Sequence, residues 1–88
     1  MNTDEVRAKL AASGAPGIRS VDAFEGVAAR VRFAPESASA VFTAVRDTLG
    51  FPHLSTVGGI DWVERYEAFY LLWSDSAKTY LLLSADLD

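Results

Sequence analysis

Residues 51–74 read FPHLSTVGGIDWVERYEAFYLLWS, and this stretch decides the fold. Its second half, YEAFYLLW at 66–73, carries aromatic and aliphatic side chains at both odd and even positions. Successive side chains of a strand point to opposite faces, so the segment predicts a central strand that is apolar on both faces. One face would hold Phe69, Leu71 and Trp73, and the other Tyr66, Ala68, Tyr70 and Leu72.

Two more strands are expected beside this one. Residues 54–61 are apolar but interrupted by Gly58-Gly59, and residues 79–85 form another apolar run. The polar residues at 75–78 predict a turn between the second and third strands. The C-terminal half is therefore expected to form a three-stranded meander.

Two helices and a hairpin are expected upstream. Thr3 is predicted as the N-cap of a first helix that ends at Gly14. Apolar residues at helical spacing predict a second helix of about 14 residues, from Pro35 to a left-handed C-cap at Gly50. Between the helices, alternation over residues 27–33 predicts a strand. A turn at Glu25-Gly26 is expected to join it to a first arm at 18–24.

These elements define an α+β fold in the order helix, strand, strand, helix, strand, strand, strand. We expect two layers, with the helices packed on one face of a mixed, mostly antiparallel sheet. The passage over residues 27–61 would be right-handed if its strands were parallel neighbours. The length of 88 residues fits one domain, at 1–88.

Composition excludes several functions. The formal net charge is −4 and the 8 Lys and Arg residues are scattered, which argues against a surface for nucleic acid or anionic lipid. There is no Cys, so disulfides, iron–sulfur ligation and thiolate nucleophiles are excluded. No apolar run approaches the ~20 residues of a membrane span. We expect a cytoplasmic chain without direct membrane insertion, which reaches a membrane only through partner subunits.

The polar residues of the opening stretch predict structure rather than chemistry. His53 is the only histidine, and no elbow motif or ligand cluster accompanies it. Gly58 and Gly59 predict a bulge or twist, and Asp61 is predicted to support the adjoining turn. Glu64 and Glu67, with Arg65, are expected in a solvated turn with a local ion pair. We assign no catalytic, metal-binding or cofactor-binding residue.

The aromatic side chains are too many for one face of a small core. If the helices cover one side of the sheet, the other side is an apolar surface of the kind that binds a partner protein. Burial within the fold is the alternative. The residues predicted to form this interface are Trp62, Tyr66, Tyr70, Leu72 and Trp73.

The segment from Val45 to Ser74 carries an ordered series of motifs. They are Val45-Arg46-Asp47-Thr48-Leu49-Gly50-Phe51 at a helix end, Leu54, Gly59-Ile60-Asp61-Trp62 at a strand end, and Arg65-Tyr66-Glu67-Ala68-Phe69-Tyr70-Leu71-Leu72-Trp73-Ser74 in the next arm. This series resembles the N-terminal domain of the thirty-kilodalton subunit family of respiratory NADH:quinone dehydrogenases, which has relatives in membrane-bound hydrogenase and formate hydrogenlyase complexes. The similarity covers roughly residues 4–86.

The resemblance implies a non-catalytic, cofactor-free scaffold subunit of an NADH dehydrogenase-like or hydrogenase-like complex. Such a subunit would dock against the large subunit and help to frame the iron–sulfur chain. The second half of the family, with its Glu-Arg-Glu-type signature, has no counterpart in this chain, and the turn at 61–65 is shorter than in the family. Two other functions stay open: a standalone ligand-binding domain with His53 and Asp61 in a cleft, and a homodimer.

Overall fold

The computed structural model describes residues 1–63 and 65–87, without the side chains of Trp62, Arg65 and Leu87. Two helical segments and five strands follow one another in the order expected from the sequence. The first half begins with α1 (Thr3–Ser13), β1 (Ile18–Asp22) and β2 (Arg30–Phe33). A helical segment follows, which consists of η1 (Pro35–Ser37), α2 (Ala38–Ala44) and η2 (Val45–Leu49). The second half contains β3 (His53–Trp62), β4 (Arg65–Ser74) and β5 (Thr79–Leu87).

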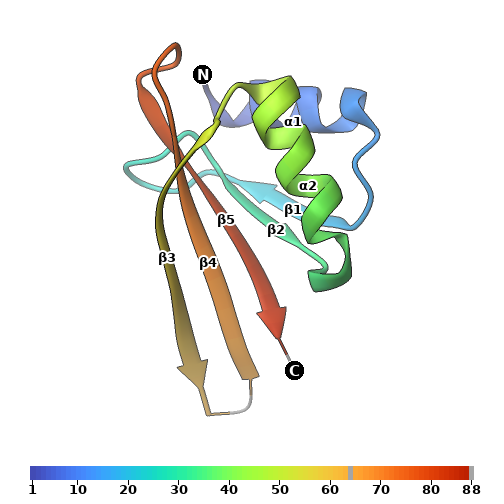
Figure 1. The fold of residues 1–88 in the computed structure, drawn as a ribbon, viewed down its shortest axis with the longest axis vertical. Coiled ribbons are helices and arrows are strands. Elements are labelled where there is room, and N and C mark those ends of the chain that lie inside the picture. Colours follow the sequence, from blue (N-terminus) through green and yellow to red (C-terminus); the bar gives the residue numbers. More distant parts are fainter. Residues whose placement is uncertain (64, 88) are drawn as a thin grey trace.

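The five strands form one mixed sheet in the order β1-β2-β5-β4-β3. The meander of β3, β4 and β5 is antiparallel, as predicted. β2 pairs with β5 in parallel and with β1 antiparallel. β2 and β3 are therefore not neighbours, and the chain crosses the sheet through α2 to begin β3 at the far edge (Figure 1).

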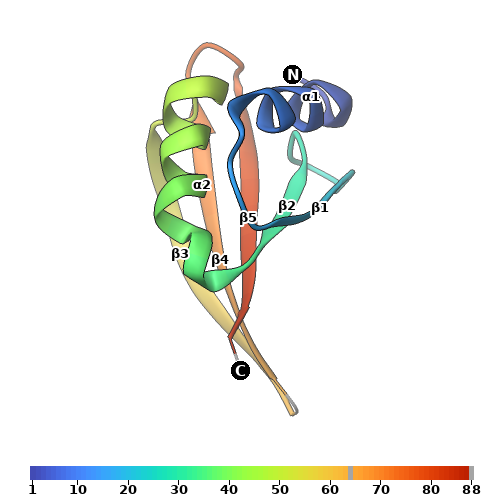
Figure 2. The same ribbon diagram turned by 90° about the vertical axis from the view of Figure 1, so that its right-hand side faces the viewer.

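The core lies between the helices and one face of the sheet. On β4 and β5, Leu72, Leu81 and Leu83 are buried at alternate positions, as strand geometry requires. Val6 of α1 and Val45 of η2 are fully buried against the same cluster. Figures 1 and 2 show both helices on this side of the sheet. Among the described residues, no helix lies on the opposite face.

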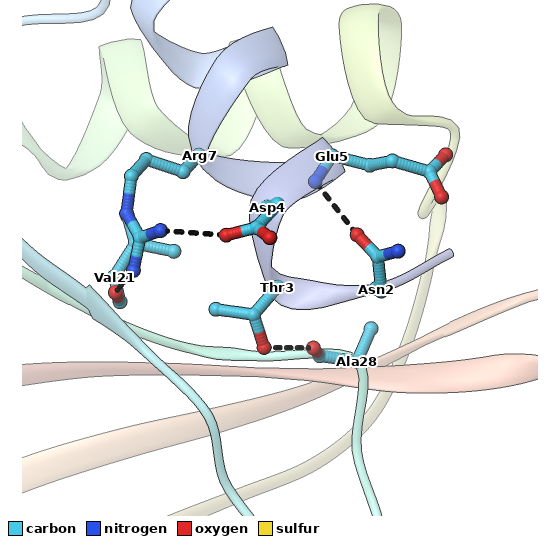
Figure 3. Close-up of polar contacts among 7 residues, drawn as sticks. All are labelled: Asn2, Thr3, Asp4, Glu5, Arg7, Val21 and Ala28. Atoms are coloured by element: carbon cyan, nitrogen blue, oxygen red, sulfur yellow. Dashed lines mark hydrogen bonds and ion pairs between the residues drawn. The ribbon is translucent and has the colours of Figure 1, made fainter.

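The first helix begins one residue earlier than predicted. Its N-cap is Asn2, whose Oδ1 accepts a hydrogen bond of 2.9 Å from the Glu5 backbone N–H (Figure 3). Thr3 already lies in the helix, and its hydroxyl donates to the Ala28 carbonyl 3.0 Å away. The predicted cap was therefore wrong, because the Thr3 hydroxyl bonds to the loop that precedes β2 instead. Gly14 ends the helix in the left-handed conformation, at φ 72°.

The second helical segment is less regular than its periodicity suggested. It opens with a turn of 3-10 helix at Pro35, continues as α2 and closes with the π-helical turn η2. Gly50 ends it at φ 80°, as predicted. The first hairpin also differs, since β2 begins at Arg30 and residues 23–29 form a longer loop than the expected Glu25-Gly26 turn.

Candidate interaction surface

We use the name open face for the side of the sheet opposite the helices. Strand register assigns its members, because paired residues on neighbouring strands share a face. Its central part contains Arg30 and Arg32 of β2, Leu82, Ser84 and Asp86 of β5, and Glu67, Phe69, Leu71 and Trp73 of β4. Polar and charged groups thus meet large apolar side chains on one surface.

Ion pairs occupy the middle of the open face. The Arg30 Nη2 atom lies 2.9 Å from Glu67 Oε2, and the Arg32 Nη2 atom lies 3.7 Å from the same oxygen and 3.4 Å from Asp86 Oδ2. The Glu67 side chain is only 4% exposed, although it lies on the face away from the helices. Neighbouring side chains of the open face therefore exclude water from this carboxylate.

The position of Glu67 corrects the sequence prediction. Glu67 was expected in a solvated turn, but it lies inside β4 and pairs with Arg30 of β2. Glu64 and the Arg65 side chain lie outside the described residues. No local pattern could have indicated this pairing, because it depends on β2 and β4 lying on either side of β5.

A half-open cavity of about 350 Å³ lies over the same ion pair. Its apolar walls are Phe24, Ile60, Phe69 and Leu82, and Arg30, Glu67 and Ser84 complete the lining. This volume is at the lower end of the ~300–1,000 Å³ range of ligand pockets. The cavity therefore suits a small group rather than a dinucleotide.

Two polar atoms at this cavity are buried and unsatisfied. The Arg30 Nε and the Ser84 Oγ have no hydrogen-bond partner within the described part of the chain. Buried polar groups almost always have partners, so each such atom requires an explanation. Phe24, from the loop after β1, lies against the guanidinium, with the Arg30 Cζ 5.8 Å from its ring centre.

The other end of the open face is aromatic. The Trp73 and Tyr80 rings lie 4.7 Å apart between centres, and the Trp73 indole N–H donates to Asp75 Oδ1 at 2.8 Å. This hydrogen bond, supported by the nearby charges of His53 and Lys78, lowers the pKa of Asp75 below its ordinary value. The His53 Nε2 lies 3.4 Å from the other Asp75 oxygen.

The residues predicted as an interface lie on different faces. Leu72 is buried in the core, and Tyr70 is half-buried against Phe42 at 4.9 Å between ring centres, so both face the helices. Trp73 lies on the open face. Tyr66 is exposed on the helix side, near the free end of the β3–β4 hairpin. The Trp62 side chain lies outside the described residues.

Gly58 and Gly59 are required by neighbouring rings of β4. A Cβ at Gly58 would collide with the Phe69 ring, and a Cβ at Gly59 would collide with the Tyr66 ring. Each ring thus lies across the backbone of β3, on opposite faces. A bulge or a twist was expected at the glycine pair, but the register irregularity between β3 and β4 lies earlier, between Leu54 and Thr56, so the bulge is not at the glycines.

His53 and Asp61 do not meet. Both lie in β3, where eight residues of strand separate them by roughly 26 Å. Both are exposed, and Asp61 lies one residue before the end of β3. Across the described residues, no group of three or more His, Asp or Glu side chains forms a metal site. The predicted cleft between His53 and Asp61 is therefore not formed.

The sequence matches no family model and none of the curated proteins. Within the described chain, neither helical segment has the length and apolar character needed to cross a bilayer.

Proposed function

We propose that this chain is a non-catalytic interaction domain of an NADH dehydrogenase-like or hydrogenase-like complex, and that it binds its neighbouring subunit through the open face. The observation that carries the proposal is the sheet surface away from the helices, on which Leu71, Trp73 and Tyr80 continue the apolar lining of the cavity. The motif series from Val45 to Ser74 supports the choice of complex.

The size of the open face supports a protein partner. Glu67 and Trp73 are six strand residues apart, which corresponds to roughly 20 Å, and five strands span a similar width. The resulting area is on the order of several hundred Å², compared with the ~800 Å² that each partner buries in a stable interface. Charged residues occupy part of this area, and its most exposed large apolar side chains are Phe24, Ile60 and Tyr80.

The composition of the open face also resembles an interface. Large aromatic and aliphatic side chains surround charged groups that are already paired with one another. Interfaces are enriched in aromatic residues and Arg. Glu and Asp are depleted at their centre, but here Glu67 and Asp86 are already paired with Arg30 and Arg32. A partner can therefore cover Glu67 and Arg30 without leaving either charge unpaired.

Affinity purification from the native host tests the proposal. The tagged chain, extracted in mild detergent, is expected to retain a large dehydrogenase or hydrogenase subunit, identified by mass spectrometry. Leu71→Arg and Tyr80→Arg place a charge on the open face and should release that subunit. Tyr80 is partly exposed, so its variant keeps the fold even if Leu71→Arg does not.

Val57→Arg is the matched control. Val57 is also exposed, but it points to the other face of β3, where it lies opposite Tyr70. We expect this variant to retain the large subunit. Purification of the unmodified chain alone, or as a homodimer by light scattering, would overturn the proposal. Equal retention by the Val57 and Tyr80 variants would refute the assignment to the open face.

A further inference from the structure

We propose that the cavity on the open face binds an uncharged segment of the partner, in which an aliphatic or aromatic side chain stands beside a free carbonyl oxygen. The side chain would fill the cavity, and the carbonyl would accept hydrogen bonds from the Arg30 Nε–H and the Ser84 hydroxyl. The identity of the occupant as a protein segment rests on the proposed function, whereas the chemistry of the site rests on this chain alone.

The cavity walls select the side chain. Phe24, Ile60, Phe69 and Leu82 enclose it on the open face, and its volume of about 350 Å³ admits one large side chain with part of its backbone. Binding sites in protein interfaces commonly centre on such an anchor, which enters a desolvated pocket. The half-open form leaves the backbone of the anchor at the cavity mouth.

The two unsatisfied atoms, Arg30 Nε and Ser84 Oγ, indicate which polar group the ligand carries. An arginine Nε–H can only donate, so its missing partner must be an acceptor. The Ser84 hydroxyl can donate to the same acceptor, and its residue is 2% exposed. A donor left unsatisfied in a buried position destabilises the protein, and an arriving acceptor would remove that cost. Two donors at one cavity therefore favour a ligand with an oxygen acceptor.

The charged side chains around the cavity indicate that the hydrogen-bond acceptor of the ligand is uncharged. Arg30 and Arg32 are already compensated by Glu67 and Asp86. Asp22, which pairs with Arg30 in the β1–β2 register, adds a further negative charge to this side of the sheet. A carboxylate ligand would meet these three acidic groups, whereas a peptide carbonyl would not. A cationic ligand offers no acceptor to either donor.

Phe24 is the cavity wall beside Arg30, which is one of the two donors. Its side chain is 48% exposed, and it packs on the Arg30 guanidinium from the loop between β1 and β2. Rotation of this ring about its side-chain torsions would open a path to Nε without any change in the sheet. The side chain of the bound segment could then pack on the Arg30 guanidinium in place of the Phe24 ring.

N-acetyl-leucinamide and N-acetyl-phenylalaninamide are suitable probes, because each joins an apolar side chain to amide carbonyls. Titration into the ¹⁵N-labelled chain should give saturable shifts at the backbone amides of Phe69 and Leu82, and a downfield shift of the Arg30 Nε–H. N-acetylglycinamide lacks the anchor, and N-acetyl-glutamate amide carries a carboxylate. Neither of these should produce the shifts at equal concentration.

Four variants separate the contribution of the cavity from that of the two hydrogen-bond donors. Ile60→Trp fills the cavity from the partly exposed edge strand and should abolish the shifts, whereas Val57→Trp, on the other face of β3, should not. Ser84→Ala and Arg30→Lys each remove one donor and should weaken the probes by roughly 3- to 10-fold. Ser84→Ala should leave the melting temperature unchanged or raise it, since it removes an unsatisfied polar atom.

Saturable binding that Ile60→Trp abolishes supports the site. Absence of binding by both apolar probes, or equal binding to the Ile60→Trp variant, would overturn it. Binding of N-acetyl-glutamate amide as tight as that of N-acetyl-leucinamide would also overturn the choice of a neutral ligand. Because these experiments need no partner, failure here leaves the proposed function standing, and failure of the affinity purification leaves this site standing.

Discussion

Arg30 and Glu67 lie 37 positions apart in the sequence, yet their side chains form a hydrogen-bonded ion pair of 2.9 Å on the open face. The pair joins β2 to β4 across the intervening strand β5. Removing one partner of a buried ion pair leaves an uncompensated charge and is strongly destabilising. We expect Glu67→Leu to lower the free energy of unfolding by about 3 kcal/mol, measured by urea denaturation.

The exposed pair between Asp4 and Arg7 provides the control for this prediction. Its N···O distance is also 2.9 Å, but the Asp4 side chain is 90% exposed. Asp4→Asn should change stability by no more than ~0.5 kcal/mol, because solvent screens the pair. The double variant Arg30→Met with Glu67→Leu should recover part of the loss. Equal effects at Glu67 and Asp4 would contradict the burial of Glu67.

Gly58 permits the Phe69 ring to lie across β3. Gly58→Ala should lower stability by about 1–2 kcal/mol, because the new methyl group displaces the ring. In a Phe69→Ala background the same change should cost nothing, since Gly in a strand is itself unfavourable by ~0.5–1 kcal/mol relative to Ala. A double-mutant cycle by chemical denaturation measures this coupling. Additive effects would show that the ring does not require the glycine.

Asn2 caps α1 through its side-chain oxygen. Asn2→Ala removes the acceptor for the Glu5 N–H and should lower the free energy of unfolding by about 1 kcal/mol (Figure 3). Asn2→Asp retains the acceptor and should restore most of the stability. Thermal denaturation followed by circular dichroism distinguishes the two variants. If Asn2→Asp were as unstable as Asn2→Ala, the cap would not operate.

The lowered pKa of Asp75 predicts how the stability of the protein depends on pH. The Trp73 indole N–H favours its charged form and lowers its pKa in the folded state. A carboxyl group with a lowered pKa contributes stability above its unfolded pKa, and that contribution is lost as the pH falls through the folded pKa. We expect the Trp73 indole N–H resonance to titrate with a midpoint below the ordinary pKa of an aspartate side chain. Asp75→Asn should remove this titration.

The sequence alone determined most local features. Alternation in YEAFYLLW placed Phe69, Leu71 and Trp73 opposite Leu72, and the structure confirms this division. Gly14 and Gly50 end the helices as expected, because a left-handed residue without Cβ is favourable at a helix C-terminus. The α+β class and the order of the elements also follow from periodicity, since each element has its own hydrophobic repeat.

The tertiary structure decided which distant residues meet. The parallel pairing of β2 with β5 brings Arg30 beside Leu82 and within reach of Glu67, and no local pattern specifies that neighbour. The Thr3 hydroxyl could cap its own helix or bond elsewhere, and the docking of α1 near Ala28 directs it to the loop that precedes β2. Phe24 and Ser84, each unremarkable in the sequence, line the cavity for the same reason. Short-range periodicity fixes the faces of an element, whereas strand order fixes which faces share a surface.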